Sequence, residues 1–265
     1  MASRLSDRTS IAALKRVRAL QQKRVRAQQR RFLVQGRKVV AELLSSRVRT
    51  ESLFASEEAA EWIGPLAAQI NVPVQVLLPR ELDKLGTFET GNELVAVAVE
   101  PDDLPFRAPS SGELMLALDG IHDPRNMGGL LRIADWFGTP RLLCSPDSME
   151  IYNPKVVQSS MGSIFRVEVR YTPLAEELRR CAASGSSIFL AHMDGTPAYQ
   201  ASLSHPSVLV LGSESHGLSE AMRALNATTI SIPRIGSAES LNVAMAAAAL
   251  CSEFARQQAR GSAAR

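Results

Sequence analysis

The sequence predicts an α/β protein with two domains, in which a small α/β domain precedes a larger domain built on a parallel sheet. Three observations lead to this prediction. Short apolar runs alternate regularly with helical stretches after residue 113, a Pro- and Ser-rich stretch interrupts the chain at 101–113, and the first residues are strongly basic. The length of 265 residues and a composition of 45% hydrophobic and 22% charged residues are those of a globular protein.

The N-terminal segment 1–30 predicts a basic helical arm, with one helix over 10–30. Twelve Lys or Arg residues lie between Arg4 and Lys38 against the single acid Asp7, whereas the rest of the chain carries a formal charge of −8. Such an asymmetry indicates a polyanionic partner. Nucleic acid is favoured over a membrane surface, because the segment lacks aromatic anchors. A solvated helix face without a partner is the alternative.

Residues 31–100 predict a small α/β domain, and residues 101–113 predict a linker, since Pro101, Pro105 and Pro109 break any regular pattern. Apolar periodicity assigns the elements of the small domain. We expect helices near 37–45 and 80–84, and strands near 52–55, 74–78 and 94–99.

Residues 114–260 predict the larger domain. Its continuous apolar strands alternate with helices, which indicates a parallel sheet covered on both faces. The loops at the carboxyl ends of such strands form the ligand crevice. We expect strands within 114–120, 140–145, 187–195, 207–215 and 228–236, with helices within 126–138, 153–162 and 173–185.

Three loops of this domain carry unusual polar patterns. In the first, Asn126 stands where a helix would begin, and Arg132 follows six residues later. In the second, two glycines bracket Glu214 at the end of a strand. The third places Ser240 and Asn242 before an Ala-rich helix, with more polar groups than a helix cap needs. Neither a dinucleotide-binding nor a P-loop glycine pattern is present.

Together the three loops resemble the signature motifs of the SpoU (TrmH-type) RNA 2′-O-ribose methyltransferases of the SPOUT superfamily, over about 114–258. The N-terminal stretch "RRFLVQGRKVVAELL" is similar to the small RNA-binding domain of many members, although Gln35 stands where Glu is expected. The matching motif positions are Asn126, Gly128 and Arg132; Gly212, Glu214 and Gly217; and Ile232, Pro233, Ser240, Leu241 and Asn242.

The resemblance implies a fold with a deep trefoil knot, a homodimer joined through the last helix, and S-adenosylmethionine as cofactor. It implies transfer of a methyl group to a ribose 2′-hydroxyl, and large-subunit ribosomal RNA is the favoured substrate. Arg132 would act as base or as a clamp on the neighbouring phosphate. The implied catalytic residues are Arg132, Asn126, Glu214, Ser240 and Asn242, and the implied cofactor-binding residues are Ala191, Gly212, Gly217, Ile232 and Leu241.

Other interpretations remain open. The substrate of the same reaction could be tRNA, or the chain could be a non-catalytic RNA-binding protein on this fold. A dinucleotide-dependent enzyme ranks last. Among the histidines, His122 and His192 are less favoured general bases, and His216 is a candidate for an RNA contact. Three widely spaced cysteines indicate reduced, buried thiols in a cytoplasmic protein without a metal site. No apolar run is long enough to predict a membrane span.

Overall fold

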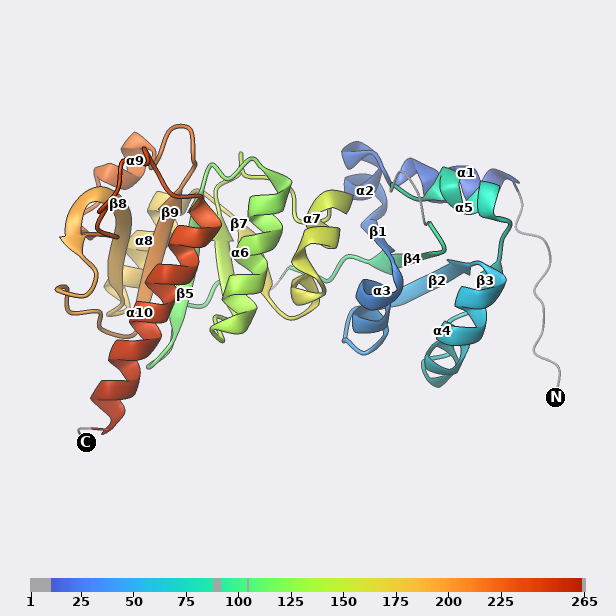
Figure 1. Cartoon of the computed structure of the whole chain (residues 1–265), viewed down its shortest axis with the longest axis horizontal. Helices are drawn as coiled ribbons and strands as arrows, with labels where there is room; N and C mark the ends of the chain where they lie inside the picture. The colour runs from blue at the N-terminus through green and yellow to red at the C-terminus, as the bar shows by residue number, and fades with distance from the viewer. Residues whose placement is uncertain (1–10, 88–91, 104, 264–265) are drawn as a thin grey trace. The chain divides into compact units, whose positions relative to one another are not determined.

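The computed structural model describes residues 11–87, 92–103 and 105–263, and side chains as far as residue 260. The chain folds into two compact units (Figure 1). The described residues through Asp102, together with Glu150–Phe165, form the first unit. Asp103–Met149 and the described residues from Arg166 onward form the second. The start of the predicted arm, 1–10, and residue 104 of the predicted linker lie outside the described residues.

The first unit begins with two helices, α1 (Ile11–Ala19) and α2 (Lys23–Gln29). The single helix predicted over 10–30 is therefore wrong. Leu20 is buried at the break, and the side chain of Gln21 donates to the carbonyls of Leu85 and Gly86, at 3.0 Å each. Burial of Leu20 and these hydrogen bonds stabilise the break between the two helices.

A four-stranded sheet forms the centre of the first unit. Its order is β1 (Arg31–Gln35), β4 (Leu94–Val99), β2 (Thr50–Ala55) and β3 (Val74–Val76). Strand β4 is antiparallel to both neighbours, and β2 is parallel to β3. Apolar side chains of β1, β2 and β4 pack with Leu82 and Leu85 in one core.

Three helices accompany this sheet: α3 (Arg37–Leu44), α4 (Glu57–Gln69) and α5 (Pro79–Leu85). The predicted strands β2, β3 and β4 and helices α3 and α5 are confirmed. Strand β1 and helix α4 were not predicted. Helix α4 carries a recognisable start signal, because the hydroxyl of Ser56 accepts a hydrogen bond from the amide of Ala59 at 3.3 Å.

The segment Glu150–Phe165 lies within the predicted domain 114–260 but packs with the first unit. It contains α7 (Pro154–Ser160) and the 3₁₀ helix η1 (Ser163–Phe165). The ring of Tyr152 stacks on Phe32 of β1, with 4.5 Å between ring centroids. Arg26 of α2 binds Glu150 through two nitrogens, at 2.8 and 2.5 Å. The first unit is thus built from two separate parts of the chain.

The second unit contains a six-stranded parallel sheet, as predicted. Only β7, a short and partly exposed edge strand, was missed. In spatial order the strands are β10 (Thr228–Ser231), β8 (Ser187–Pro197), β9 (Ser207–Gly212), β5 (Leu114–Asp119), β6 (Arg141–Cys144) and β7 (Glu168–Tyr171).

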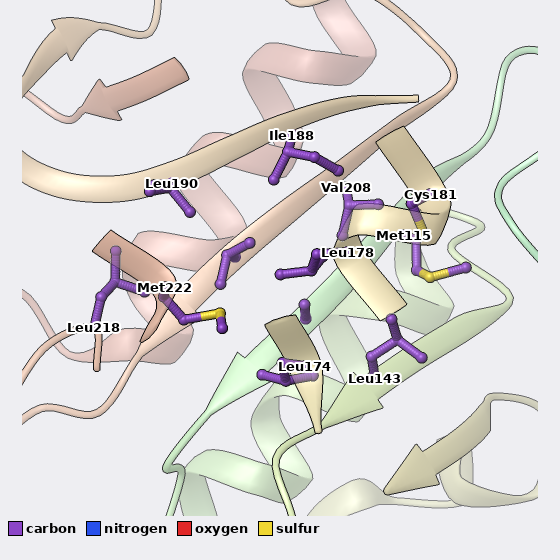
Figure 2. Close-up of a cluster of buried hydrophobic side chains, with 12 residues drawn as sticks. Met115, Leu143, Leu174, Leu178, Cys181, Ile188, Leu190, Val208, Leu218 and Met222 are labelled. Atoms are coloured by element: carbon purple, nitrogen blue, oxygen red, sulfur yellow. The ribbon is translucent and has the colours of Figure 1, made fainter. Parts of the chain in front are cut away.

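Helices α6 (Pro124–Trp136) and α10 (Val243–Ala263) pack side by side against this sheet (Figure 1). Helices α8 (Leu174–Ala183) and α9 (Glu220–Arg223) contribute to another apolar cluster, formed with alternate residues of β5, β8 and β9 (Figure 2). Cys144, Cys181 and Cys251 are buried and unpaired, as predicted. Among the described helices, none is long and apolar enough to cross a membrane.

Candidate active site

Three loops at one edge of the parallel sheet enclose a cleft of about 190 Å³. The first loop follows β5, the second follows β9, and the third contributes the start of α10. Such an edge is the expected position of a ligand site in a parallel sheet. The lining residues are Gly120, Ile121, His122, Asp123 and Asn126; Ser213, Glu214 and Ser215; and Val243.

The first loop ends in a helix cap, but Asn126 is not the capping residue. Asp123 caps α6, since its Oδ1 accepts from the amides of Arg125 and Asn126 at 2.8 and 2.9 Å. Pro124 follows at the first helical position, where its missing N–H costs nothing. The predicted cap at Asn126 is therefore wrong by one turn, which leaves its side chain available for other contacts.

Asn242 joins the three loops into one network. Its Oδ1 caps α10 by accepting from the amides of Ala244 and Met245, at 3.0 and 3.3 Å. Its Nδ2 donates to Asn126 Oδ1 at 2.8 Å and to Glu214 Oε1 at 2.5 Å. A single asparagine thus both caps the helix and connects the other two loops.

The second loop is a tight turn that presents Glu214. Ser213 and Gly217 exchange backbone hydrogen bonds of 3.0 and 2.9 Å, and Gly217 has a φ of 65°. A Cβ atom at Gly212 would collide with the backbone of Gly217, so the turn requires glycine there. Beyond the turn, the carboxylate of Asp119 accepts from the amide of Ser219 at 2.6 Å.

Two of the predicted catalytic residues lie outside this network. Arg132 is exposed on α6 and does not line the cleft. Arg132 follows Asn126 by six residues, which correspond to about 600° of helical rotation. The two side chains therefore leave α6 on different sides. Gly129 lies between them and allows close packing with Ala244 of α10. Ser240 is also exposed and absent from the lining.

Of the predicted cofactor-binding residues, Ala191 lies in β8 and Gly212 ends β9, whereas Gly217, Ile232 and Leu241 lie in the loops that follow β9 and β10. Strand β8 pairs with β10 up to Leu190 and again from Thr196, so the five residues 191–195 leave the pairing. The hydroxyl of Ser231 donates to the carbonyl of Gly195 at 2.7 Å, which places the 191–195 segment beside the start of the loop that contains Ile232.

These loops leave apolar side chains uncovered. Met193 is 64% exposed, Ile235 100% and Leu241 51%, whereas Ala191 and Ile232 are half-buried. Apolar groups beside accessible main chain suit the flat face of an adenine ring. The residues present are therefore compatible with the implied cofactor.

One part of the cleft contains a histidine that its sequence pattern did not favour as a catalytic residue. His122 lines it, and its Nε2 lies 3.6 Å from Asp147 Oδ2. A hydrogen bond from the hydroxyl of Ser145 lowers the pKa of Asp147, and His122 lowers it further. The Ser145 hydroxyl also accepts from the amide of Gly120 at 2.9 Å. Neither His192 nor His216 is among the lining residues.

Groups of three or more His, Cys, Asp or Glu side chains that could hold a metal ion do not occur in the described part of the chain. The geometry at the cleft is instead that of a polar site fixed by three loops. It offers amide and carboxylate groups to orient a polar substrate, an imidazole that can exchange protons, and an apolar surface nearby.

Comparisons with known proteins identify both units. The SpoU rRNA Methylase family matches residues 113–252, and the MRM3-like substrate binding domain matches residues 12–96. The 23S rRNA (uridine(2479)-2′-O)-methyltransferase of Streptomyces viridochromogenes is 33% identical over 252 residues, which are 90% of this chain and 86% of that protein. The 23S rRNA (guanosine(2553)-2′-O)-methyltransferase RlmP of Bacillus subtilis is 26% identical, over 87% of this chain and 91% of its own length.

A solved structure agrees with these relatives. The SpoU methyltransferase AviRb of Streptomyces viridochromogenes, in complex with AdoMet, superimposes with a TM-score of 0.83 and 28% identity. The match covers 94% of this chain and 100% of that one. The family match over the second unit and the identity across nearly the whole chain agree with the three motifs. The chain belongs to the SpoU rRNA methylase family.

Proposed function

We propose that this protein is an enzyme that methylates a ribose 2′-hydroxyl of large-subunit ribosomal RNA, with S-adenosylmethionine as its cofactor. The observation that carries the proposal is the hydrogen-bond network of Asn126, Glu214 and Asn242, which ties three motif loops together at one cleft. The relatives described above are 23S rRNA 2′-O-methyltransferases, and the matched structure holds AdoMet. The cytoplasm is the expected location for such a substrate.

The network orients the reaction rather than performing it. Asn126, Glu214 and Asn242 are bound mainly to one another and to the start of α10, so they fix the shape of the cleft. A fixed site aligns the 2′-oxygen with the methyl group, which is the main requirement of a methyl transfer. Arg132 and Ser240 complete the proposed site by holding the RNA phosphate.

The cofactor supplies an activated methyl group on a sulfonium when it is bound. Ala191, Gly212, Gly217, Ile232 and Leu241 would hold it, through backbone groups and through the apolar surface that these loops expose. Three features support this assignment: the half-exposed Leu241, the detour of residues 191–195 away from β10, and the sharp turn between Gly212 and Gly217.

A trefoil knot and a homodimer belong to the same proposal. Strand β9 lies between β5 and β8, and the chain after β10 returns to contact the β5 and β9 loops through Asn242, as a knot would require. Helix α10 exposes Met245, 66% accessible, beside the Ala-rich run, which suits packing against a second copy. In such a dimer, Arg132 would serve the cleft of the partner, because it does not line its own.

The first unit supplies the proposed RNA-binding surface. Exposed cations follow one another along α1 and α2: Lys15, Arg16, Arg18, Lys23 and Arg24. Closely spaced exposed cations are the usual means of binding phosphates. This proposal divides the chain into an arm (1–30), a substrate domain (31–100), a linker (101–113) and a catalytic domain (114–260).

Titration of the purified protein with S-adenosylmethionine, by calorimetry, tests the proposal first. We expect binding by the wild type and none by Leu241→Arg, whose guanidinium would occupy the apolar pocket. Leu241→Met is the matched control, since it keeps the apolar contact and should still bind. A Leu241→Arg variant that is folded, as judged by circular dichroism, and still binds would contradict the pocket assignment.

Methyl transfer from radiolabelled S-adenosylmethionine to unmodified RNA transcripts tests the substrate. Large-subunit rRNA should accept the label. The phosphodiester bond after the labelled nucleotide should then resist alkaline cleavage, because a 2′-O-methyl group removes the attacking hydroxyl. Label on tRNA alone would mean that the substrate is tRNA rather than rRNA. Binding of cofactor and RNA without transfer would indicate a non-catalytic protein.

A further inference from the structure

Methylation of a ribose hydroxyl releases a proton, and the cleft must provide a group that accepts it. Arg132 suits this role poorly, because a guanidinium stays protonated at neutral pH and Arg132 does not line the cleft. The titratable side chains that line it are His122, Asp123 and Glu214.

Both carboxylates already bind main-chain groups. Asp123 Oδ1 accepts from two amides at the start of α6, and Glu214 Oε1 accepts from Asn242 Nδ2 and, at 3.3 Å, from the amide of Val243. Their role is therefore to hold the two helix starts in place. An imidazole is also the better match for a base near neutral pH, since histidines titrate between about pH 5 and 8.

Asp147 lies beside the ring of His122. The Nε2 atom of His122 is 3.6 Å from Asp147 Oδ2, and a hydrogen bond from Ser145 lowers the pKa of Asp147. An Nε2–H directed at Asp147 would leave the lone pair of Nδ1 free to accept a proton. Asp123, from the same loop as His122, and Glu214, from the loop after β9, line the same cleft. Carboxylates near an imidazole stabilise its protonated form.

We propose that His122 is a catalytic residue that accepts the proton of the ribose 2′-hydroxyl, with Asp147 as its positioning residue. This role rests on the proposed function. The lone pair of the 2′-oxygen forms the new O–C bond, the electron pair of the broken S–C bond stays on sulfur, and the hydroxyl proton passes to Nδ1. Arg132 is then left to hold the phosphate.

Single-turnover methylation of unmodified large-subunit rRNA, with the full-length protein and saturating S-adenosylmethionine, tests this role. We expect His122→Ala to slow transfer by about 10²–10⁴-fold, the usual contribution of a general base. The wild-type rate should rise with pH as the imidazole loses its proton, and the variant should lose that rise. Added imidazole should restore part of the rate of His122→Ala. Asp147→Asn should slow transfer less and should not respond to imidazole.

His205→Gln is the matched control, because it removes a histidine that contacts Glu113 and Phe254 and does not line the cleft, so it should keep the wild-type pH profile. Unchanged S-adenosylmethionine binding by His122→Ala would show that the variant is folded. A His122→Ala variant with the wild-type rate and pH dependence would overturn the role of His122, while an active wild type would leave the proposed function intact. Absence of transfer by the wild type would instead contradict the proposed function, and this role with it.

Discussion

Each unit has a polar network that joins distant parts of the chain, and the two networks differ in burial. In the first unit, Arg26 is 3% exposed, binds Glu150 through two nitrogens, and donates through its remaining nitrogen to the carbonyls of Leu20 and Gln21. In the second unit, Asn242 holds Asn126 and an exposed Glu214 at the edge of an open cleft.

The difference separates a structural network from a functional one. A buried guanidinium whose three nitrogens all donate to protein groups is already committed to internal contacts, so its contribution is to folding. An exposed network beside a cleft can bind a polar ligand without first breaking a buried contact. We therefore expect changes in the first network to alter stability, and changes in the second to alter activity.

Glu150→Ala should have the largest effect on stability. It leaves the buried Arg26 without its counter-ion, which costs about 3–5 kcal/mol in comparable cases. Urea unfolding followed by circular dichroism measures the change. The exposed pair of Arg180 and Glu176 provides the control, because Glu176→Ala should leave the unfolding midpoint nearly unchanged.

The double variant Arg26→Met with Glu150→Leu sharpens this prediction. It replaces the pair by apolar groups, and such replacements of buried ion pairs are often neutral or stabilising. We expect it to recover most of the stability lost in Glu150→Ala. Equal instability of the single and double variants would mean that the carbonyl contacts of Arg26, rather than its charge, dominate.

Arg132→Ala should abolish most activity without weakening cofactor binding. Loss of the group that holds the phosphate beside the reacting ribose misplaces the 2′-oxygen, and such a misplacement can cost about 10²-fold in rate. Mixing Arg132→Ala with an inactive Glu214→Ala variant tests whether Arg132 serves the partner's cleft. Mixed dimers would then contain one intact site and regain part of the wild-type rate. Mixing without any recovery would contradict the shared site.

Asn242→Ser separates the two roles of this residue. A serine can still cap α10, whereas it is too short to reach Asn126 and Glu214. We expect Asn242→Ser to keep nearly the wild-type stability and lose methyl transfer. Asn242→Ala should lose transfer and also about 0.5–2 kcal/mol of stability, the usual cost of a lost cap. Equal stability of the two variants would show that the cap contributes little.

The sequence predicted the fold of the second unit better than that of the first. Long apolar strands between helices give a strong periodic signal, and only the short, half-exposed strand β7 and the four-residue helix α9 were missed there. In the first unit, strand β1 and helix α4 were missed, and the break between α1 and α2 depends on distant contacts of Gln21. The packing of Glu150–Phe165 with the first unit also depends on such contacts, of Arg26 and Phe32.

At the cleft, the sequence supplied the residue types, and the structure showed how they meet. Asn126, Glu214 and Asn242 could be selected because polar residues followed strand ends, but the bonds between them join residues up to 116 positions apart. The cap at Asp123 was predictable, since Asp followed by Pro is a strong helix start. The pairing of His122 with Asp147 was not, because it depends on the path of another loop.

Thiol labelling can report the unfolding of the second unit separately from that of the first, and here we expect the smallest effect. All three cysteines lie in the second unit, and burial raises the pKa of Cys181 to about 11 and that of Cys251 to about 12. We expect none of them to react with a thiol reagent near pH 8 in the native protein, and all three to react in urea.

If the two units unfold separately, Glu150→Ala will lower the urea concentration of the first transition, while thiol labelling will begin at the same urea concentration as in the wild type. Labelling that shifts together with the first transition would show that the Arg26–Glu150 pair stabilises both units, because the segment Glu150–Phe165 is continuous with the second unit at each end.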